Sequence, residues 1–257
     1  MKHDFKTEAE LCAAFIAWVK AESGRHRHGV KTPVWTPYAE TAGWDILLVG
    51  EDGTQIGIEA KLKFNMKVLT QCLPDCYDYY GERRGPDFRA VLVPDFNSEH
   101  ERICAALGLM LIATKGHGSE FRPDLTPERQ GWYSSAPGWH FWNPVERCRV
   151  PEYVPDVVAG SSAPIQLTDW KIKALRILAT VDVRGYVTKD DFKEHRIDPR
   201  VWTGPAAYLV PGSAQGQWVR GKAEFDKQHP EVYPKILEEV RQSLKAKEVA
   251  PCTPSLV

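Results

Sequence analysis

Segments with the hydrophobic spacing of a helix and segments with the character of strands alternate along the first half of the chain. Residues 7–20 place Leu11, Phe15 and Val19 at helical spacing, and Thr7 and Glu10 have the spacing of a capping box. Residues 41–49 and 54–64 then have the character of neighbouring strands joined by a glycine-containing turn, Glu51-Asp52-Gly53. This pattern predicts a helix followed by a β-hairpin.

The alternation of helices and strands continues to residue 113. Asn65 is placed to cap a second helix, in which Met66, Leu69, Cys72 and Leu73 form one apolar stripe, and Pro74 is expected to kink or split it. The predicted order is helix, three strands, helix, strand, helix, strand. Its later elements are a buried strand over 88–93, a helix opened by Ser98 with Glu101 and closed by Gly108, and a second buried strand over 109–113.

Charged residues interrupt the second strand of the hairpin. Because side chains alternate along a strand, Glu59, Lys61 and Lys63 are expected on one face, opposite the apolar residues between them. Such a polar stripe costs free energy to desolvate unless a ligand binds there. A divalent cation held by Asp45 and Glu59 is the simplest explanation, so the sequence predicts a metal-dependent active site.

The order of these residues, an acid, a strand turn and then Glu-x-Lys, resembles the PD-(D/E)xK nuclease superfamily, whose fold is restriction-endonuclease-like. Trp44 stands where the dipeptide of that motif has proline. The order of elements around the motif is also similar to the core of that superfamily. We therefore expect an α/β (α+β) fold, with a mixed central sheet flanked by helices.

The resemblance implies a role for each residue of the motif. Asp45, Glu59 and the backbone carbonyl of Ala60 would hold Mg²⁺, for which Mn²⁺ is expected to substitute. The metal would activate water and act as a Lewis acid on the scissile phosphate, and Lys61 would position the water and offset developing charge. Further candidates are Glu8, with Glu10 as its rival, Gln71 after the Glu-x-Lys motif, and Glu40; each of these could equally be an ordinary exposed polar residue.

The second half of the chain has a different organisation. Residues 148–166 are rich in proline and small residues, which indicates a linker or a meandering edge between a domain over 1–147 and one over 167–250. Three helices are expected after Thr168, Thr188 and Asp198, followed by short strands over 207–210 and 217–220. This order resembles winged helix-turn-helix domains. An amphipathic segment over 230–247 either caps this domain or forms a dimer contact.

Winged-helix domains bind either DNA or proteins, and both alternatives stay open. If this domain binds DNA, its third helix and its hairpin are expected to contact the duplex. The candidate contacts are Arg196, Arg200 and Arg220, with Lys189 and Lys193 as helpers, while Lys63, Lys67, Arg83 and Arg84 could line the path beside the metal and residues 25–28 could touch phosphates.

Composition and charge limit how the protein could bind nucleic acid and in which compartment it is expected. The 257 residues carry 33 basic and 34 acidic side chains, so nucleic-acid binding would depend on local patches rather than on net charge. No apolar run reaches the ~20 residues that cross a bilayer. The six cysteines are irregularly spaced, which favours reduced thiols in the cytoplasm over a zinc site at Cys72 and Cys76. The aromatic cluster over 131–144 is expected to pack a subdomain or a domain junction, with base stacking as the alternative.

Three functional hypotheses follow. The first is a Mg²⁺-dependent endonuclease that hydrolyses double-stranded DNA and is targeted by the winged helix. The second is a catalytically silent, nuclease-like DNA-binding protein, and the third is a structure-specific nuclease acting on branched DNA or RNA. Double-strand cutting with one active site per chain would favour a homodimer.

Overall fold

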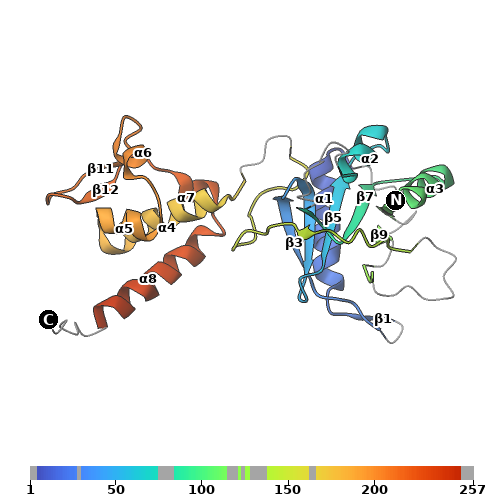
Figure 1. Cartoon of the computed structure of the whole chain (residues 1–257), viewed down its shortest axis with the longest axis horizontal. Coiled ribbons are helices and arrows are strands. Elements are labelled where there is room, and N and C mark those ends of the chain that lie inside the picture. The colour runs from blue at the N-terminus through green and yellow to red at the C-terminus, as the bar shows by residue number, and fades with distance from the viewer. Residues whose placement is uncertain are drawn as a thin grey trace. The chain divides into compact units, whose positions relative to one another are not determined.

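The computed structural model divides the chain into two compact units, one over residues 1–166 and one over residues 167–257 (Figure 1). It describes residues 5–27, 30–74, 84–114, 121–122, 125–127, 138–161 and 166–249. Among these residues, no helix has the length and hydropathy needed to cross a membrane.

The first unit is built on a mixed β-sheet. Within the described residues, six strands form this sheet in the order β3-β4-β5-β7-β8-β9. The strands β3, β4 and β5 form an antiparallel meander, β5, β7 and β8 are parallel, and β9 is antiparallel to β8. Their bounds are Trp35–Thr41 (β3), Trp44–Gly50 (β4), Gln55–Ala60 (β5), Phe88–Val93 (β7), Met110–Thr114 (β8) and Phe121–Arg122 (β9).

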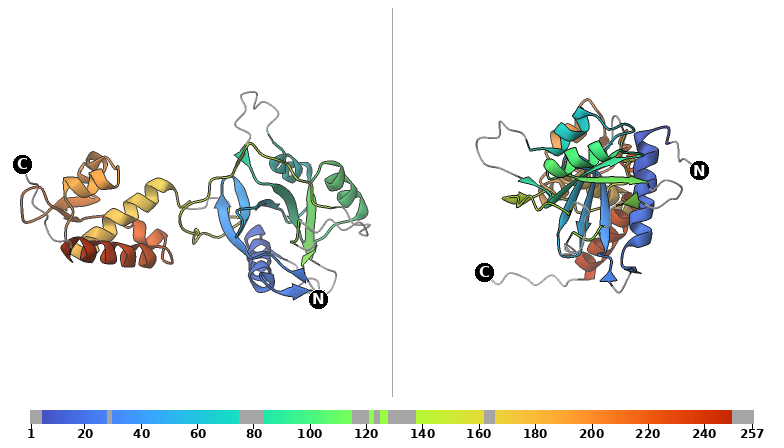
Figure 2. Two further views of the ribbon diagram at one scale, coloured as in Figure 1. Left: turned by 60° about the horizontal axis from the view of Figure 1, so that its bottom comes forward. Right: turned by 90° about the vertical axis from the view of Figure 1, so that its right-hand side faces the viewer.

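Helices cover both faces of this sheet. Helix α1 (Glu8–Glu22) packs through Leu11, Phe15 and Val19 on one face, and α2 (Met66–Cys72) and α3 (Ser98–Ala106) pack on the other (Figure 2). The two faces have separate hydrophobic clusters because side chains alternate along each strand. The expected mixed α/β architecture with a sheet flanked by helices is therefore confirmed.

The first turns of the helices in the first unit follow the sequence prediction, except at the cap of α3 and at Met66 in α2. Thr7 and Asn65 accept hydrogen bonds from the backbone amides of Glu10 and Val68, as expected for N-caps. The cap of α3 is Asn97, which forms a capping box with His100, so the prediction that Ser98 with Glu101 opens the helix was displaced by one residue. Met66, expected in the apolar stripe of α2, is 71% exposed because it occupies the first turn, outside the packed stripe.

Short strand pairs extend this unit beyond the sheet. Strand β1 (His26–Arg27) pairs with β2 (Val30–Lys31), and β6 (Arg84–Gly85) pairs in parallel with β10 (Glu146–Arg147). The segment after β10 packs on the first unit, where Cys148, Tyr153 and Ala159 are buried. Between residues 148 and 161 the chain therefore behaves as an edge of the first unit, the second of the two alternatives for this segment.

The second unit is mainly helical. Its longest helices, α4 (Asp169–Arg184) and α8 (Tyr233–Val249), pack against each other, so the C-terminal helix covers this unit. Thr168 caps α4, Gly185 ends it in the left-handed conformation, and Trp202 is fully buried in the core. The remaining elements are α5 (Lys189–Glu194), α6 (Pro199–Thr203), the antiparallel pair β11 (Leu209–Pro211) and β12 (Trp218–Arg220), and α7 (Phe225–Gln228).

The described part of the aromatic segment contributes to packing. Trp139 is buried and contacts Phe88 edge-on, with ring centroids 5.9 Å apart. Phe141 lies against the same ring but is 52% exposed. Trp132 and Tyr133 lie outside the described residues.

Candidate active site

Strand pairing places the two predicted carboxylates side by side. Ile46 of β4 pairs with Ile58 of β5, so Asp45 and Glu59 occupy the next position of the ladder. One carboxylate oxygen of Asp45 (Oδ2) accepts a hydrogen bond of 2.8 Å from the backbone amide of Ala60. Glu59 is 2% exposed. Both carboxyl groups are thus fixed at the end of the hairpin, where β4 begins and β5 finishes.

Lys61 lies directly after β5 and connects the carboxylates to helix α1. Its ammonium nitrogen (Nζ) donates to the carbonyl of Ala60 at 2.8 Å and to Glu8 Oε2 at 2.9 Å, and it lies 3.9 Å from Asp45 Oδ2. The strand ends at Ala60, so the predicted strand alternation through Lys63 is wrong; the chain turns there to enter α2, and Lys63 is exposed.

Of the two rival glutamates on α1, the structure brings Glu8 into the cluster. Glu8 is the first residue of the helix, and its side chain pairs with Lys61. Glu10 instead accepts a hydrogen bond from the backbone amide of Lys6 at 2.8 Å. Glu10 therefore serves the start of the helix, although it bonds Lys6 rather than completing the expected capping box with Thr7.

Glu40 adds a fourth carboxylate near this cluster. It lies near the end of β3 with a φ of 47°, in the left-handed region, and one of its oxygens (Oε1) accepts from the backbone amides of Gly160 and Ser161 at 2.7 and 3.2 Å. Burial and the nearby charge of Asp45 raise the pKa of Glu40. The cluster is thus closed on this side by the edge segment that follows β10.

Burial and mutual repulsion make the carboxyl groups unusually basic. Burial, followed by the charge of Asp45, raises the pKa of Glu59 to about 8, even though Lys61 acts in the opposite direction. Burial also raises the pKa of Asp45 against the opposing effects of the Ala60 amide and Lys61. For Lys61, burial lowers the pKa, but the surrounding carboxylates outweigh it and the net shift is upward. Lys61 therefore remains an ammonium ion at neutral pH.

The oxygen donors of this cluster come from both side chains and backbone. Among the described residues, no three His, Cys, Asp or Glu side chains are arranged so that they alone could hold a metal ion. The oxygen donors in this cluster are the carboxylates of Asp45 and Glu59 and the carbonyl of Ala60. The ammonium group of Lys61 donates a hydrogen bond to that carbonyl. This is an all-oxygen set of the kind that suits a hard divalent cation.

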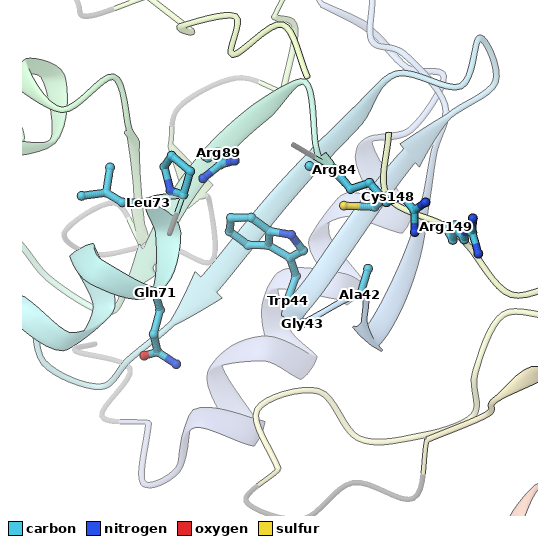
Figure 3. A pocket seen from close by; sticks show the side chains of 11 residues that line it. Ala42, Gly43, Trp44, Gln71, Leu73, Arg84, Arg89, Cys148 and Arg149 are labelled. Carbon is cyan, nitrogen blue, oxygen red and sulfur yellow. The ribbon is translucent and has the colours of Figure 1, made fainter. Parts of the chain in front are cut away.

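Gln71 does not join the carboxylates through any described hydrogen bond. It is exposed on α2 and lines a pocket together with Trp44, and its amide points away from the Trp44 indole (Figure 3). The same pocket contains Arg89, which sequence reasoning missed because it lies in an apolar strand, where a single arginine gives no periodic signal. Cys12 was also missed. It is buried beside Gly160, and burial together with the charges of Asp45, Glu40 and Glu8 raises the pKa of its thiol.

The described cysteines Cys12, Cys72, Cys104 and Cys148 are free and buried, as reduced thiols would be. Cys76, the second half of the zinc alternative, lies outside the described residues. So does Arg83, whereas Lys63 and Lys67 are described and exposed.

The predicted DNA contacts of the second unit fall into two groups. Arg196, Lys189 and Lys193 are exposed, and Arg200 is exposed while forming a forked pair with Asp198. Arg220 is different, because it bonds Asp182, Asp226 and the carbonyl of Ala223. These contacts tie β12 to α4 and α7 and give Arg220 a structural role, while its contact with DNA stays a prediction.

Comparisons with protein-family models, with curated proteins and with solved structures found no match for this chain.

Proposed function

We propose that the protein is a Mg²⁺-dependent endonuclease that hydrolyses phosphodiester bonds in DNA at the cluster of Asp45, Glu59 and Lys61. The observation that carries the proposal is the position of the Lys61 ammonium group, 3.9 Å from Asp45 and bonded to both Glu8 and the carbonyl of Ala60. Asp45 and Glu59 occupy neighbouring ladder positions of β4 and β5, and Lys61 follows directly after β5. This proximity of two acids and a lysine supports the proposal.

The residues fit a divalent cation. Glu59 is almost completely buried, and burial together with the like charge of Asp45 raises the pKa of Glu59 to about 8. A cation shared by these two carboxylates and the carbonyl of Ala60 would remove that repulsion, and hard oxygen donors favour Mg²⁺ over softer metals. Bound there, Mg²⁺ would supply an activated water and charge neutralisation at the scissile phosphate.

Lys61 contributes positive charge rather than proton abstraction. Its raised pKa keeps the side chain protonated at neutral pH, so it is a poor general base. As an ammonium ion it can donate hydrogen bonds to a water or to a phosphate oxygen and stabilise negative charge that develops there. Glu8 holds Lys61 from the other side at 2.9 Å and fixes the direction of the side chain.

The second unit is the proposed targeting module. Its order of three helices followed by an antiparallel strand pair is similar to that of winged helix-turn-helix domains. Arg196 and Arg200, near and in the third of these helices, are exposed, as a DNA-contacting surface requires. Under this proposal, the second unit binds DNA and the first unit hydrolyses the phosphodiester bond.

Cleavage assays on supercoiled plasmid, linear duplex, branched DNA and single-stranded RNA, each with Mg²⁺ or EDTA, test the proposal. We expect Mg²⁺-dependent cutting of duplex DNA, and a loss of about 100-fold or more in rate for Asp45→Asn and for Lys61→Ala. Lys20→Ala on the exposed side of α1 is the matched control and should cut at the parental rate.

Thermal melting of each variant separates a damaged fold from a damaged site. Absence of cutting on every substrate with Mg²⁺ or Mn²⁺ would contradict the proposal. Parental rates for both Asp45→Asn and Lys61→Ala would show that the hydrolytic site lies elsewhere. Preferential cutting of branched DNA or RNA would keep the site and change the substrate.

A further inference from the structure

A second polar feature of the first unit is a pocket that contains three arginines. Its volume is about 440 Å³, and among its described lining residues are Arg84, Arg89 and Arg149 but no aspartate or glutamate. Figure 3 shows the Trp44 side chain between Arg89 on one side and Arg84, Cys148 and Arg149 on the other. The lining therefore carries a concentrated positive charge in a protein whose net charge is −1.

Arg89 is the most unusual of the three because it is buried and has no acidic partner among the residues that the structure describes. It lies in β7, is 9% exposed, and donates one hydrogen bond of 2.6 Å from Nη1 to the carbonyl of Cys72. Its Nε is buried with no hydrogen-bond partner in the described structure. The guanidinium carbon lies 4.4 Å from the ring centroid of Trp142 and 5.7 Å from that of Trp44.

These aromatic contacts compensate only part of the cost of burying the cation. A buried guanidinium needs either a counter-charge or a full set of acceptors, because desolvation of an ion exceeds what cation–π contacts return. Burial accordingly lowers the pKa of Arg89. An anion in the pocket would supply what the described side chains do not.

The other two arginines extend this positive region toward solvent. Arg149 is exposed, and the Arg84 side chain, which pairs with Glu146 at 2.7 Å, is about one-third exposed. Gly85 keeps the pocket open beside Arg89, because a Cβ there would lie 3.0 Å from Arg89 Nη2. A planar, forked guanidinium recognises phosphate with paired hydrogen bonds, which makes arginine the preferred side chain for this ligand.

Two observations relate the pocket to the carboxylate cluster. Trp44 lines the pocket and directly precedes Asp45 in β4. Cys72 packs in the same hydrophobic cluster as Trp44, and the pKa of its buried thiol is raised by the nearby charge of Glu59 and lowered by that of Arg89. A nucleic-acid strand lying at Asp45 and Glu59 would therefore place a neighbouring phosphate near the arginines.

We propose that this pocket binds a phosphate group of the nucleic-acid strand that is cut at the Asp45, Glu59 and Lys61 cluster. The inference rests on the proposed nuclease function, which it deepens by assigning a phosphate subsite to the first unit. Arg89 forms the buried end of the subsite, and Arg149 forms its solvent side.

The test measures binding of a fluorescein-labelled DNA duplex of about 20 base pairs to the full chain in EDTA, over a range of salt concentrations. Arg149→Ala should raise the Kd about 5- to 10-fold and reduce the slope of log K against log salt by about 0.9, the value for one lost phosphate contact. Arg89→Lys keeps the charge but loses the fork, and it should also raise the Kd. Arg102→Ala, an exposed arginine on α3, is the matched control and should leave both quantities unchanged.

A second arm uses inorganic phosphate alone and follows thermal unfolding at constant ionic strength. Because Arg149 is exposed, Arg149→Ala should fold normally. This variant therefore still tests the subsite if Arg89→Lys proves unstable. An unchanged Kd and salt slope for Arg149→Ala, or absence of duplex binding by the parent chain, would overturn the subsite. The subsite would also be overturned if inorganic phosphate raised the melting temperature of the chain while the duplex did not bind, because the ligand of the pocket would then be free phosphate.

The subsite and the nuclease proposal can fail separately. If the parent binds duplex through Arg149 but cuts nothing with Mg²⁺, the subsite stands and the hydrolytic function fails. If the parent cuts DNA and Arg149→Ala has parental affinity and rate, the function stands and the subsite fails.

Discussion

At the scale of single residues, one buried glutamate dominates the electrostatics of the candidate site. Glu59 is 2% exposed, and its pKa is raised to about 8 by burial and by Asp45. The folded chain therefore binds a proton on Glu59 over a pH range in which the unfolded chain has released it. This difference couples the stability of the first unit to pH.

The sign of that coupling can be predicted. A carboxyl group with a raised pKa contributes full stability below its ordinary pKa of 4.5, and the contribution is lost as the pH rises toward 8. Glu59→Gln has no proton to lose, so it should be more stable than the parent above about pH 8, by up to about 5 kcal/mol, with little difference near about pH 4.5. Denaturant unfolding of the first unit across this range measures the effect.

Glu51→Gln, at an exposed turn position, is the control and should follow the parental curve. The same experiment with Mg²⁺ has a defined outcome under the proposed function. Because metal ligands must be deprotonated, Mg²⁺ should stabilise the parent more at about pH 8.5 than at about pH 6, and should not stabilise Glu59→Gln to the same extent. Equal pH dependence for the parent and Glu59→Gln would refute the pKa assignment.

At the scale of elements, the pairing of β4 with β5 depends on a residue that has no side chain. Gly57 pairs with Leu47, and the indole of Trp44 lies over it; a Cβ at position 57 would be 2.5 Å from that ring and 2.7 Å from Pro86. Both neighbours are fixed in the packed interior. The position of Trp44, and with it that of Asp45, thus depends on a glycine in the adjacent strand.

We expect Gly57→Ala to destabilise the first unit by about 1 to 3 kcal/mol, because the methyl group overpacks the space that Trp44 occupies. The displaced indole should also move Asp45 and reduce any Mg²⁺-dependent cleavage. The double variant Gly57→Ala with Trp44→Leu provides the control, since the smaller side chain makes room for the methyl group. Its loss of stability should be less than the sum of the two single losses, and strict additivity would exclude the contact as the cause.

The sequence anticipates the elements of the first unit better than their contacts. Periodicity and turn residues place the hairpin, both parallel strands and three helices, because each of these patterns is local. The motif likewise anticipates that Asp45, Glu59 and Lys61 lie close together, since Lys61 follows Glu59 by two residues and Asp45 lies on the hairpin partner of the strand that holds Glu59. Arg89 and the packing of residues 148–161 could not be predicted in this way, because they depend on contacts between segments distant in sequence.

At the scale of the whole molecule, the proposed DNA binding would depend on local charge because 33 basic and 34 acidic residues nearly cancel. Two arginines of the second unit differ in whether their charge faces solvent or holds the unit together. Arg200 is exposed, and its pairing with Asp198 is of the kind that solvent screens strongly. Arg220 holds three elements of the unit together through Asp182, Asp226 and Ala223.

This difference predicts opposite results for two arginine-to-alanine variants. Arg200→Ala should weaken duplex binding and reduce the salt slope by about 0.9 without lowering the melting temperature. Arg220→Ala should lower the stability of the second unit by about 2 to 4 kcal/mol, because it leaves two carboxylates at a partly buried site without their partner. Binding isotherms and unfolding curves of the full chain, measured on the same samples, give both quantities.

Alanine variants of the exposed arginines Arg196 and Arg200, compared with Arg149→Ala, also decide what the second unit does. If Arg200→Ala and Arg196→Ala bind duplex with the parental affinity and salt slope while Arg149→Ala in the first unit does not, the affinity for DNA belongs to the first unit alone. The second unit would then be a protein-contact module, which winged-helix-like folds also provide. If the losses in the two units are independent and additive, each contributes separate phosphate contacts, and the chain binds DNA through both of its units.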